Sequence, residues 1–478
     1  MTEKSFYSSF LVHFGCVPTE SQAVLFGELE KFIRSHDSKE IFIVKGYAGT
    51  GKTSVLAAFV KALRDFNVKT KLLAPTGRAA KVFSLKSETE AFTVHKHIYR
   101  RKSKVDITSG LDLQKNLFKN TVFFVDEASM IGDYTLLKDG QINPRNLLED
   151  LVEYVYSGEY CRLILIGDEG QLPPVGGDFS PALNDEYMSN HFTNIAISSY
   201  GLKEVLRQSE DSEVLRNATL LRNTNWVDYP KFDLKPGGDL IRITGMELQE
   251  MLELSYSIFG EEDTILITRS NKNANEYNKQ IRGRILWYEE KLCSGDILMV
   301  VKNNYFWLGD DTKIGFIANG EMVRIVRVRK IEELHGFEFA HLIVRFVDYD
   351  ELGEVELIIH TESLNVEGPS LSRERLKDLF FSVERDYAHI REKKKRYEKI
   401  LADPYFNALQ VKYAYAVTCH KSQGGQWSDV YIDQGYIKEE MLNPDYYRWL
   451  YTALTRGTNR VYLVNFADEF FQIKNHPI

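Results

Sequence analysis

The sequence predicts an α/β protein with two parallel sheets, and three observations support this fold class. Short apolar runs, often rich in β-branched residues, recur along the chain, with helical stretches between many of them. Each run ends in a polar turn, where open α/β sheets place their ligands. A glycine-rich turn and a helical stretch follow the first run directly. The runs are Ile41–Lys45, Thr70–Ala74, Thr121–Val125, Leu163–Ile166, Thr264–Ile267, Tyr413–Val417 and Val461–Val464.

Composition restricts the class of protein. With 478 residues, the chain is long enough for several domains. No apolar run approaches the roughly 18 residues of a membrane span, so we expect no membrane partner. The four cysteines lie far apart without CxxC spacing, which favours reduced thiols in a cytoplasmic protein over disulfides or a zinc site. The net charge of −8 excludes a histone-like coat but leaves room for a localised basic channel.

Two segments interrupt the α/β pattern. Residues 98–119 are basic, and a Thr108-Ser109-Gly110 loop would pair Ile107 with Leu111 and Val105 with Leu113 in a small hairpin. Residues 293–365 contain short strand-like runs and an Asn-Gly turn, which predict a small antiparallel barrel. Residues 366–410 carry apolar side chains at helical spacing beside a basic cluster, and they predict an amphipathic arm. The spaced residues are Leu376, Phe380, Val383, Tyr387, Ile390, Tyr397 and Leu401, and the cluster is 393–396.

The glycine-rich turn matches the phosphate-loop pattern GxxxxGK[ST] over residues 46–53. Such a loop turns successive backbone N–H groups toward phosphates, and the following helix N-terminus assists it. Lys52 should reach the β- and γ-phosphates of ATP, and Thr53 should bind Mg²⁺. The alternative is a chance glycine-rich turn, which the strand, loop and helix in register disfavour.

Two acids end a later strand. Asp126 would complete the Mg²⁺ shell, and Glu127 would polarise the attacking water. Alone, this pair could equally be a solvated strand end, but the phosphate loop makes the functional reading stronger. Arg207 and Arg456 are candidates to stabilise the departing phosphate, although position alone does not distinguish them from surface arginines.

The ordered motifs resemble those of superfamily 1 helicases of the 5′→3′ branch, the RecD-like and Dda-like enzymes. Residues 18–22 resemble the Q motif, 74–80 motif Ia, 93–96 motif Ib, 125–129 motif II, 167–175 motif III, 417–424 motif V and 451–457 motif VI. Arg207 stands where the family has its motif IV arginine. Gly425-Gln426-Trp427 differs from the commonest sequence of the family after motif V, and we assign it no function.

The resemblance implies two RecA-like P-loop NTPase lobes, a wedge hairpin and an SH3-like barrel with a helical arm. The first lobe would comprise residues 1–97 and 120–190, and the second would comprise 191–292 and 411–478. Residues 98–119 would form the hairpin, 293–365 the barrel and 366–410 the arm.

The resemblance also assigns residues to two sites between the lobes. Lys52, Asp126, Glu127, Gln171, Arg207 and Arg456 would be catalytic. Gln22 would read the adenine. The nucleotide would further contact Gly46, Ala48, Gly49, Thr50, Gly51, Lys52, Thr53, Ser54 and Gly424. Single-stranded DNA would contact Pro75, Thr76, Gly77, Arg78, Thr93, His95, Pro173, Thr418, His420 and Lys421.

We therefore expect an ATP- and Mg²⁺-dependent DNA helicase that moves 5′→3′ on single-stranded DNA and acts at single-strand/duplex junctions. We expect a monomer that serves repair, recombination or replication, with protein partners in such a complex. One alternative is a translocase, or a motor subunit of a recombination or nuclease assembly, that does not unwind on its own. A nucleotide-gated binding module and a small-molecule kinase are further alternatives, disfavoured by the full set of catalytic residues and by the second-lobe motifs.

Overall fold

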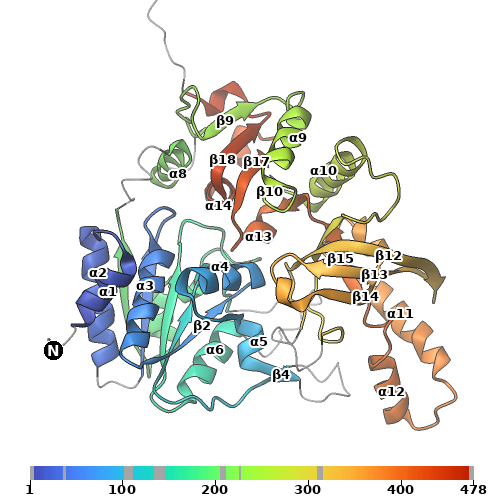
Figure 1. Ribbon diagram of the computed structural model, residues 1–478, viewed down its shortest axis with the longest axis horizontal. Coiled ribbons are helices and arrows are strands. Elements are labelled where there is room, and N and C mark those ends of the chain that lie inside the picture. Colours follow the sequence, from blue (N-terminus) through green and yellow to red (C-terminus); the bar gives the residue numbers. More distant parts are fainter. Residues whose placement is uncertain are drawn as a thin grey trace, which may run out of the picture.

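Two α/β lobes face each other in the computed structural model, and a β-barrel with a helical arm lies beside them (Figure 1). The structure describes residues 5–35, 39–101, 111–133, 146–204, 212–224, 228–308 and 316–472. The predicted α/β class with two parallel sheets is confirmed. Among the described residues, no helix combines the length and the apolarity that a bilayer crossing requires.

The first lobe contains a six-stranded parallel sheet in the order β3-β2-β6-β7-β1-β8. Its central strands are buried along their length, as the apolar runs predict. The strands are β1 (Glu40–Gly46), β2 (Lys69–Ala74), β3 (Ala91–Thr93), β6 (Thr121–Val125), β7 (Arg162–Gly167) and β8 (Ala196–Leu202). The helices are α1 (Phe6–Phe14), α2 (Glu20–Arg34), α3 (Lys52–Asp65), α4 (Gly77–Ser87), α5 (Val94–Ile98), α6 (Leu147–Tyr156) and α7 (Asp185–His191).

Strand β8 corrects the predicted boundary between the lobes. It pairs with β1 along seven positions, from Glu40↔Ala196 to Gly46↔Leu202, so residues 196–202 belong to the first lobe. The prediction that the second lobe begins at 191 is therefore wrong. As an edge strand with serines and only one fully buried residue, β8 lacks the apolar run that marks the central strands.

The second lobe contains a five-stranded parallel sheet in the order β16-β10-β17-β18-β9. The strands are β9 (Leu240–Ile243), β10 (Thr264–Thr268), β16 (Ala416–Thr418), β17 (Trp427–Asp433) and β18 (Gly457–Val464). The helices are α8 (Glu213–Asn223), α9 (Leu248–Phe259), α10 (Asn271–Arg284), α13 (Cys419–Ser422) and α14 (Pro444–Leu454).

The barrel is closed by a strand, residues 409–413, that the prediction divided between the arm, up to 410, and the second lobe, from 411. It comprises β11 (Ile297–Val300), β12 (Met322–Leu334), β13 (Phe337–Phe346), β14 (Glu354–His360) and β15 (Leu409–Tyr413). Strand β15 pairs antiparallel with β11 but parallel with β14, so the barrel is mixed and not purely antiparallel. The helical arm supplies the long crossover that a parallel neighbour requires. The predicted strand Tyr413–Val417 is accordingly divided between the barrel and the second sheet.

The arm consists of two helices, α11 (Arg373–Asp386) and α12 (Lys393–Leu401). Leu379 and Val383 of α11 share a buried cluster with Phe337 and Phe339 of the barrel, which attaches the arm. The expected helical spacing does not run unbroken, because Tyr387 and Ile390 lie between the two helices.

The hairpin region begins and ends with a short antiparallel pair, β4 (Tyr99–Arg101) and β5 (Leu111–Leu113). In this pair Leu111 lies opposite Arg101 and Leu113 lies opposite Tyr99. The predicted partners of the two leucines, Ile107 and Val105, lie outside the described residues. The predicted register is nevertheless wrong, because the chain pairs six residues farther from the turn, with β4 as the partner strand.

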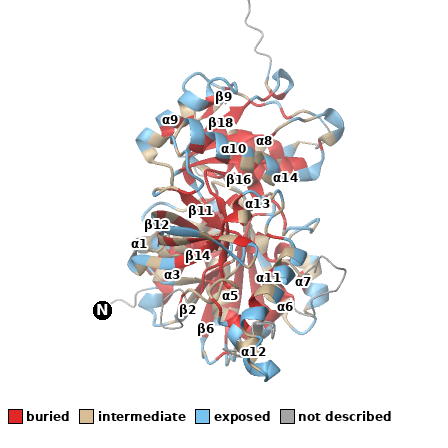
Figure 2. Ribbon diagram, turned by 90° about the vertical axis from the view of Figure 1, so that its right-hand side faces the viewer, coloured by how far each residue is buried: buried red, intermediate tan, exposed pale blue. Residues whose placement is uncertain are grey.

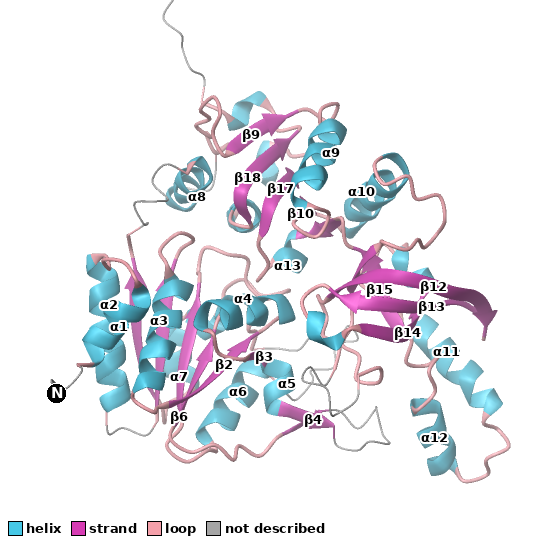
Figure 3. Cartoon of the chain, viewed as in Figure 1, coloured by secondary structure: helices cyan, strands magenta, loops and turns pink. Residues whose placement is uncertain are grey.

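The clusters of buried apolar residues show which parts of the molecule share a core. Two apolar clusters fill the two faces of the first sheet, whereas one continuous cluster spans the second lobe and the barrel. Buried strands run through all three parts, with more exposed helices around them (Figures 2 and 3). The barrel is therefore packed to the second lobe through shared core, and the first lobe has a core of its own.

Candidate nucleotide site and nucleic-acid channel

The phosphate loop lies between the end of β1 and the start of α3. Gly49 and Gly51 both have φ = 79°, in the left-handed region that suits glycine. At Gly46, a Cβ atom would lie 2.8 Å from Thr50 Oγ1, so the turn leaves no room for a side chain there. The predicted residues 46–54 thus form a continuous loop and first helical turn. Their N–H groups and the helix N-terminus favour an anion at this position.

Lys52 extends across the mouth of this loop. Its Nζ donates to the carbonyl oxygens of Gly46, at 2.5 Å, and Tyr47, at 3.0 Å. It also lies 3.8 Å from Asp168 Oδ2. The ammonium is therefore positioned where a bound phosphate would meet it.

The two predicted acids follow β6 at the same edge of the sheet. Thr53 Oγ1 donates to Asp126 Oδ2 over 3.4 Å, and Asp126 Oδ1 accepts the Glu127 N–H at 2.9 Å. Burial raises the pKa of both carboxyls, and the positive charge of Arg456 opposes this shift at Glu127. A hydroxyl beside a carboxylate is an oxygen set that fits Mg²⁺, which is commonly held by one or two carboxylates together with phosphates.

The second lobe reaches the phosphate loop through α14. The hydroxyl of Tyr451 accepts the Ala48 N–H at 2.9 Å and donates to Asp168 Oδ2 at 2.7 Å. The Arg456 guanidinium is buried and donates to the Thr452 carbonyl at 3.0 Å and the Gly425 carbonyl at 3.3 Å. Sequence reasoning gave neither Tyr451 nor Asp168 a role, although Asp168 lies two residues beyond the predicted strand Leu163–Ile166 and directly follows β7.

The segment around Gln171 is held by the second lobe from both sides. The Leu172 N–H donates to Thr452 Oγ1, and the Leu172 carbonyl accepts from Gln423 Nε2, both at 2.8 Å. Gln171 itself is buried, and its Oε1 has no hydrogen-bond partner within the described part of the chain. A buried amide oxygen of this kind is available for a water or ligand hydrogen.

Three further residues bear on the predicted nucleotide site. Gln22 accepts the Thr19 N–H and donates to the Thr50 carbonyl, both at 3.0 Å, so it braces the loop from behind. Arg207 lies outside the described residues. The Arg222 guanidinium of α8 stacks over the Tyr47 ring at 3.8 Å, a contact that no sequence signal indicated.

A second cavity of about 700 Å³ opens between the lobes and the barrel. Four residues predicted to bind DNA line it: Thr76, Thr418, His420 and Lys421. Lys421 Nζ has no hydrogen-bond partner among the described residues, and burial lowers its pKa to about 8. Residues that the sequence reasoning missed also line this interlobe channel: Pro174, Arg269, Ser270, Lys272, Asn319 and Pro369.

The structure corrects three predicted contacts. Pro173 is buried, and the next residue, Pro174, reaches the channel instead. The Arg78 guanidinium stacks on Trp427 at 4.1 Å and donates to the Gln426 carbonyl at 2.9 Å, so it joins the lobes and does not line the channel.

Gly424 was predicted to contact the nucleotide, and the structure places it against α4. At φ = 74°, a Cβ there would lie 2.8 Å from Thr76 Oγ1 and 3.0 Å from Ala79 Cβ. The glycine thus permits a close approach of the second lobe to α4, away from the phosphate loop.

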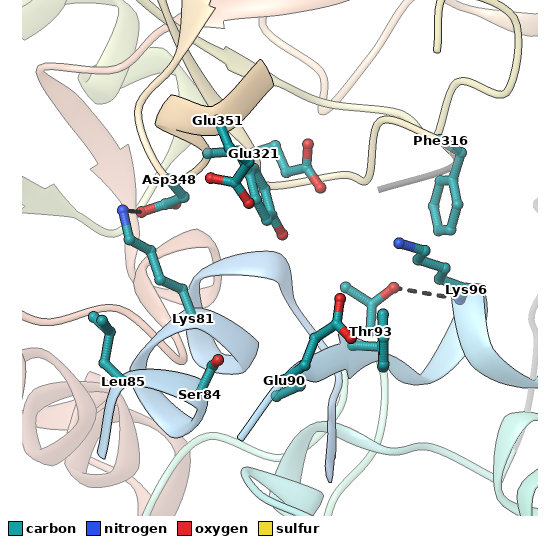
Figure 4. Close-up of a pocket in the computed structure, with 13 residues that line it drawn as sticks. Lys81, Ser84, Leu85, Glu90, Thr93, Lys96, Phe316, Glu321, Asp348 and Glu351 are labelled. Atoms are coloured by element: carbon teal, nitrogen blue, oxygen red, sulfur yellow. Dashed lines mark hydrogen bonds and ion pairs between the residues drawn. The ribbon is translucent and has the colours of Figure 1, made fainter. Parts of the chain in front are cut away.

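The remaining predicted DNA contacts lie toward the barrel. Thr93 and Lys96 face Glu321 and Asp348 across a pocket of about 230 Å³ (Figure 4). Burial raises the pKa of Glu321 to about 8. Gly77 lies against the Glu321 side chain, and Lys81 pairs with Asp348 at 3.5 Å.

The other two predicted contacts flank this region. Pro75 is half-buried between β2 and Thr76. His95, the second residue of α5, has its pKa lowered to about 4 by burial, so it is neutral near pH 7. Thr93, Gly77 and their neighbours form the joint between the first lobe and the barrel.

Comparisons with known proteins agree with this arrangement. The AAA domain family matches residues 29–227, and the UvrD-like helicase C-terminal domain matches residues 413–464. The ATP-dependent DNA helicase dda of Enterobacteria phage T4 is 28% identical over 320 residues, covering 64% of this chain and 67% of that protein. The RecBCD enzyme subunit RecD of Buchnera aphidicola is 22% identical over 456 residues, covering 90% of this chain and 70% of that protein.

A solved structure of two coordinating Pif1 helicases at forked double-stranded DNA has the same fold. Its TM-score is 0.50 at 16% identity, and the match covers 96% of this chain and 95% of that chain. The matched families lie on the two lobes that meet at the phosphate loop. The chain therefore belongs to the superfamily 1 helicases, in the branch of the Dda-like and RecD-like enzymes, and it shares its fold with Pif1 helicases.

Proposed function

We propose that this ATP-dependent DNA helicase moves 5′→3′ along single-stranded DNA and separates the duplex ahead of it, with Mg²⁺ as the metal. One observation carries the proposal: Leu172 is hydrogen-bonded by Thr452 on one side and by Gln423 on the other. Gln423 lines the interlobe channel, and Thr452 follows Tyr451, which contacts the phosphate loop. A change at the nucleotide site would therefore be transmitted to the channel through a short rigid segment.

The chemistry assigned to the nucleotide site follows from its charges. The loop N–H groups and Lys52 would hold the phosphates, and Thr53 with Asp126 would hold Mg²⁺, which supplies charge neutralisation when bound. Glu127 would accept a proton from the attacking water, which requires the ionised carboxylate. Arg456 favours that form, because its positive charge acts against the burial that raises the Glu127 pKa.

Lobe movement would link hydrolysis to translocation. The first lobe has a core of its own, whereas the barrel shares a core with the second lobe. We infer that the barrel travels with the second lobe when the nucleotide site opens and closes. Lys421, on α13, would then move along the channel relative to Thr76 of the first lobe.

The motif resemblance to the 5′→3′ branch supports the polarity, and the β4–β5 pair supports the predicted wedge hairpin. The test uses partial duplexes that carry a single-stranded tail at either the 5′ or the 3′ side. We expect strand separation with the 5′ tail only, and none for Lys52→Ala. Separation with the 3′ tail alone would overturn the polarity. Shortening the segment between Arg101 and Leu111 should lower unwinding while ATPase remains.

The similarity to a RecBCD subunit favours one second candidate, a motor that translocates without unwinding on its own. DNA-stimulated ATPase and streptavidin displacement from a single strand, without separation of either partial duplex, would support that candidate. We place either activity in DNA repair, recombination or replication.

A further inference from the structure

A groove of about 470 Å³ lies between the barrel and the arm, apart from both sites described above. One wall is the loop that follows β11, with Lys302 and Tyr305, and the other is one face of α11. Arg373, Lys377 and Phe381 lie on that face at spacings of four residues. Phe406 and His360 lie between the walls.

The described lining of the groove carries positive charge and no carboxylate. None of the residues that line it is acidic, whereas Lys302, Arg373 and Lys377 are basic. Neither Lys302 nor Lys377 forms an ion pair with another residue in the described ranges, and both are exposed. The chemistry therefore favours a ligand with negative charge.

Aromatic and polar groups accompany these cations. The Phe381 side chain is 57% exposed, and Phe380 meets it edge to face at 5.6 Å. His360 is 1% exposed, and its Nδ1 has no hydrogen-bond partner among the described residues. An exposed ring beside lysine ammonium groups is the combination that binds single-stranded nucleic acid, in which bases stack and phosphates are neutralised.

The loop wall of the groove is held in place. Asn304 Nδ2 and Trp307 Nε1 both donate to the Asn407 carbonyl, at 2.8 and 2.9 Å. The Asn304 N–H and carbonyl also pair with Ile317. Lys302 and Tyr305 are thus presented by a fixed loop, which lowers the entropic cost of binding.

The groove adjoins the interlobe channel through two hydrogen bonds. Asn303 lines the groove, and its Oδ1 accepts the N–H of Asn319, a channel residue, at 2.7 Å. On the other wall, Gln410 of the groove accepts the Leu371 N–H at 2.9 Å, two residues beyond Pro369 of the channel. We propose that the groove between the barrel and α11 is a second contact for single-stranded nucleic acid, extending the track of the interlobe channel.

This proposal rests on the proposed function, and the experiment separates the two. Fluorescence anisotropy would measure the affinity of the full chain for labelled oligo-dT of increasing length, with DNA-stimulated ATPase followed in parallel. For wild type we expect two gains in affinity with oligonucleotide length: one as the channel is filled, and a second when the oligonucleotide is long enough to reach the groove. In a Lys302→Ala/Lys377→Ala variant this second gain should vanish. The salt slope on long oligonucleotides should then fall by about 0.7 per lost phosphate contact.

Stacking is tested separately at Phe381. Phe381→Leu keeps apolar bulk but removes the ring, and we expect about a 5-fold or greater loss on long oligonucleotides, the lower limit for one stacked base. Phe381→Trp should restore the affinity. Lys399→Ala, an exposed arm lysine outside the groove, is the matched charge control and should behave as wild type.

The outcomes are distinct. Short-oligonucleotide affinity and stimulated ATPase should be unchanged in every groove variant. If the groove variants also bind long oligonucleotides as wild type does, the groove is off the DNA track and the proposal is overturned; a protein-docking groove would give this result. Absent ATPase stimulation in wild type would instead refute the proposed function.

Discussion

The hydroxyl of Tyr451 offers a sharp test of how the two lobes are held together. Tyr451→Phe removes one oxygen that accepts the Ala48 N–H and donates to Asp168. A neutral hydrogen bond contributes about 1 kcal/mol and one to a charged group about 1.5–3 kcal/mol. Because water can reach the partners once the lobes separate, we expect about 2 kcal/mol of docking free energy to be lost. This corresponds to roughly a 30-fold larger open population.

Hydrogen exchange of peptides covering residues 46–53 and 447–456 would measure that opening. We expect exchange to rise about 30-fold in both peptides, with little change in the strands of either sheet. Tyr447→Phe is the matched control, because its hydroxyl lies on the same helix but donates to the Asp228 carbonyl within the second lobe. Equal exchange in wild type and Tyr451→Phe would refute the view that this hydroxyl joins the lobes.

Three other substitutions test separate sites. Glu127→Gln keeps the shape of the side chain but cannot accept a proton. Steady-state ATPase activity should therefore fall by about 10²–10⁴-fold, while nucleotide binding, measured by calorimetry, persists. An undiminished ATPase rate would show that Glu127 is not catalytic. Arg78→Ala should leave the salt dependence of single-strand binding unchanged, because Arg78 stacks on Trp427. Lys421→Ala should reduce the slope of that dependence by about 0.7. The reverse pattern would show that Arg78 contacts a phosphate. Burial lowers the His360 pKa from 6.5 to about 4. The free energy of unfolding should therefore be highest above pH 6.5 and should fall by about 3 kcal/mol as the pH decreases toward 4, because only the unfolded state binds a proton in this range. Urea unfolding at pH 7 and pH 4.5 should show a smaller pH effect in His360→Leu, and an equal effect would reject this account.

The sequence predicted the phosphate site more fully than the channel. Residues 46–54 are contiguous, and a strand, a turn and a helix in order are enough to place their N–H groups on one anion. The same holds for Asp126 and Glu127, which simply follow a buried strand. By contrast, motif resemblance placed Arg78 and Gly424 at ligands, whereas packing places them between the lobes.

Errors in the predicted boundaries have a common physical origin. Strand β8 and strand β15 are each defined by a partner far away in the chain, and neither carries a local signal of which sheet it joins. Pairing register depends on which faces are buried together, and this is a property of the whole domain.

The sequence by itself determined the α/β class, the phosphate loop, the acids that follow β6 and the motif order, because these depend on local periodicity and on residues that are neighbours in the chain. Only the tertiary structure decided that Tyr451 closes on Ala48, 403 positions away, that Arg78 stacks on Trp427, and that a cationic groove adjoins the channel. Such contacts arise where separately folded surfaces meet, and their geometry depends on how the lobes, barrel and arm pack against one another.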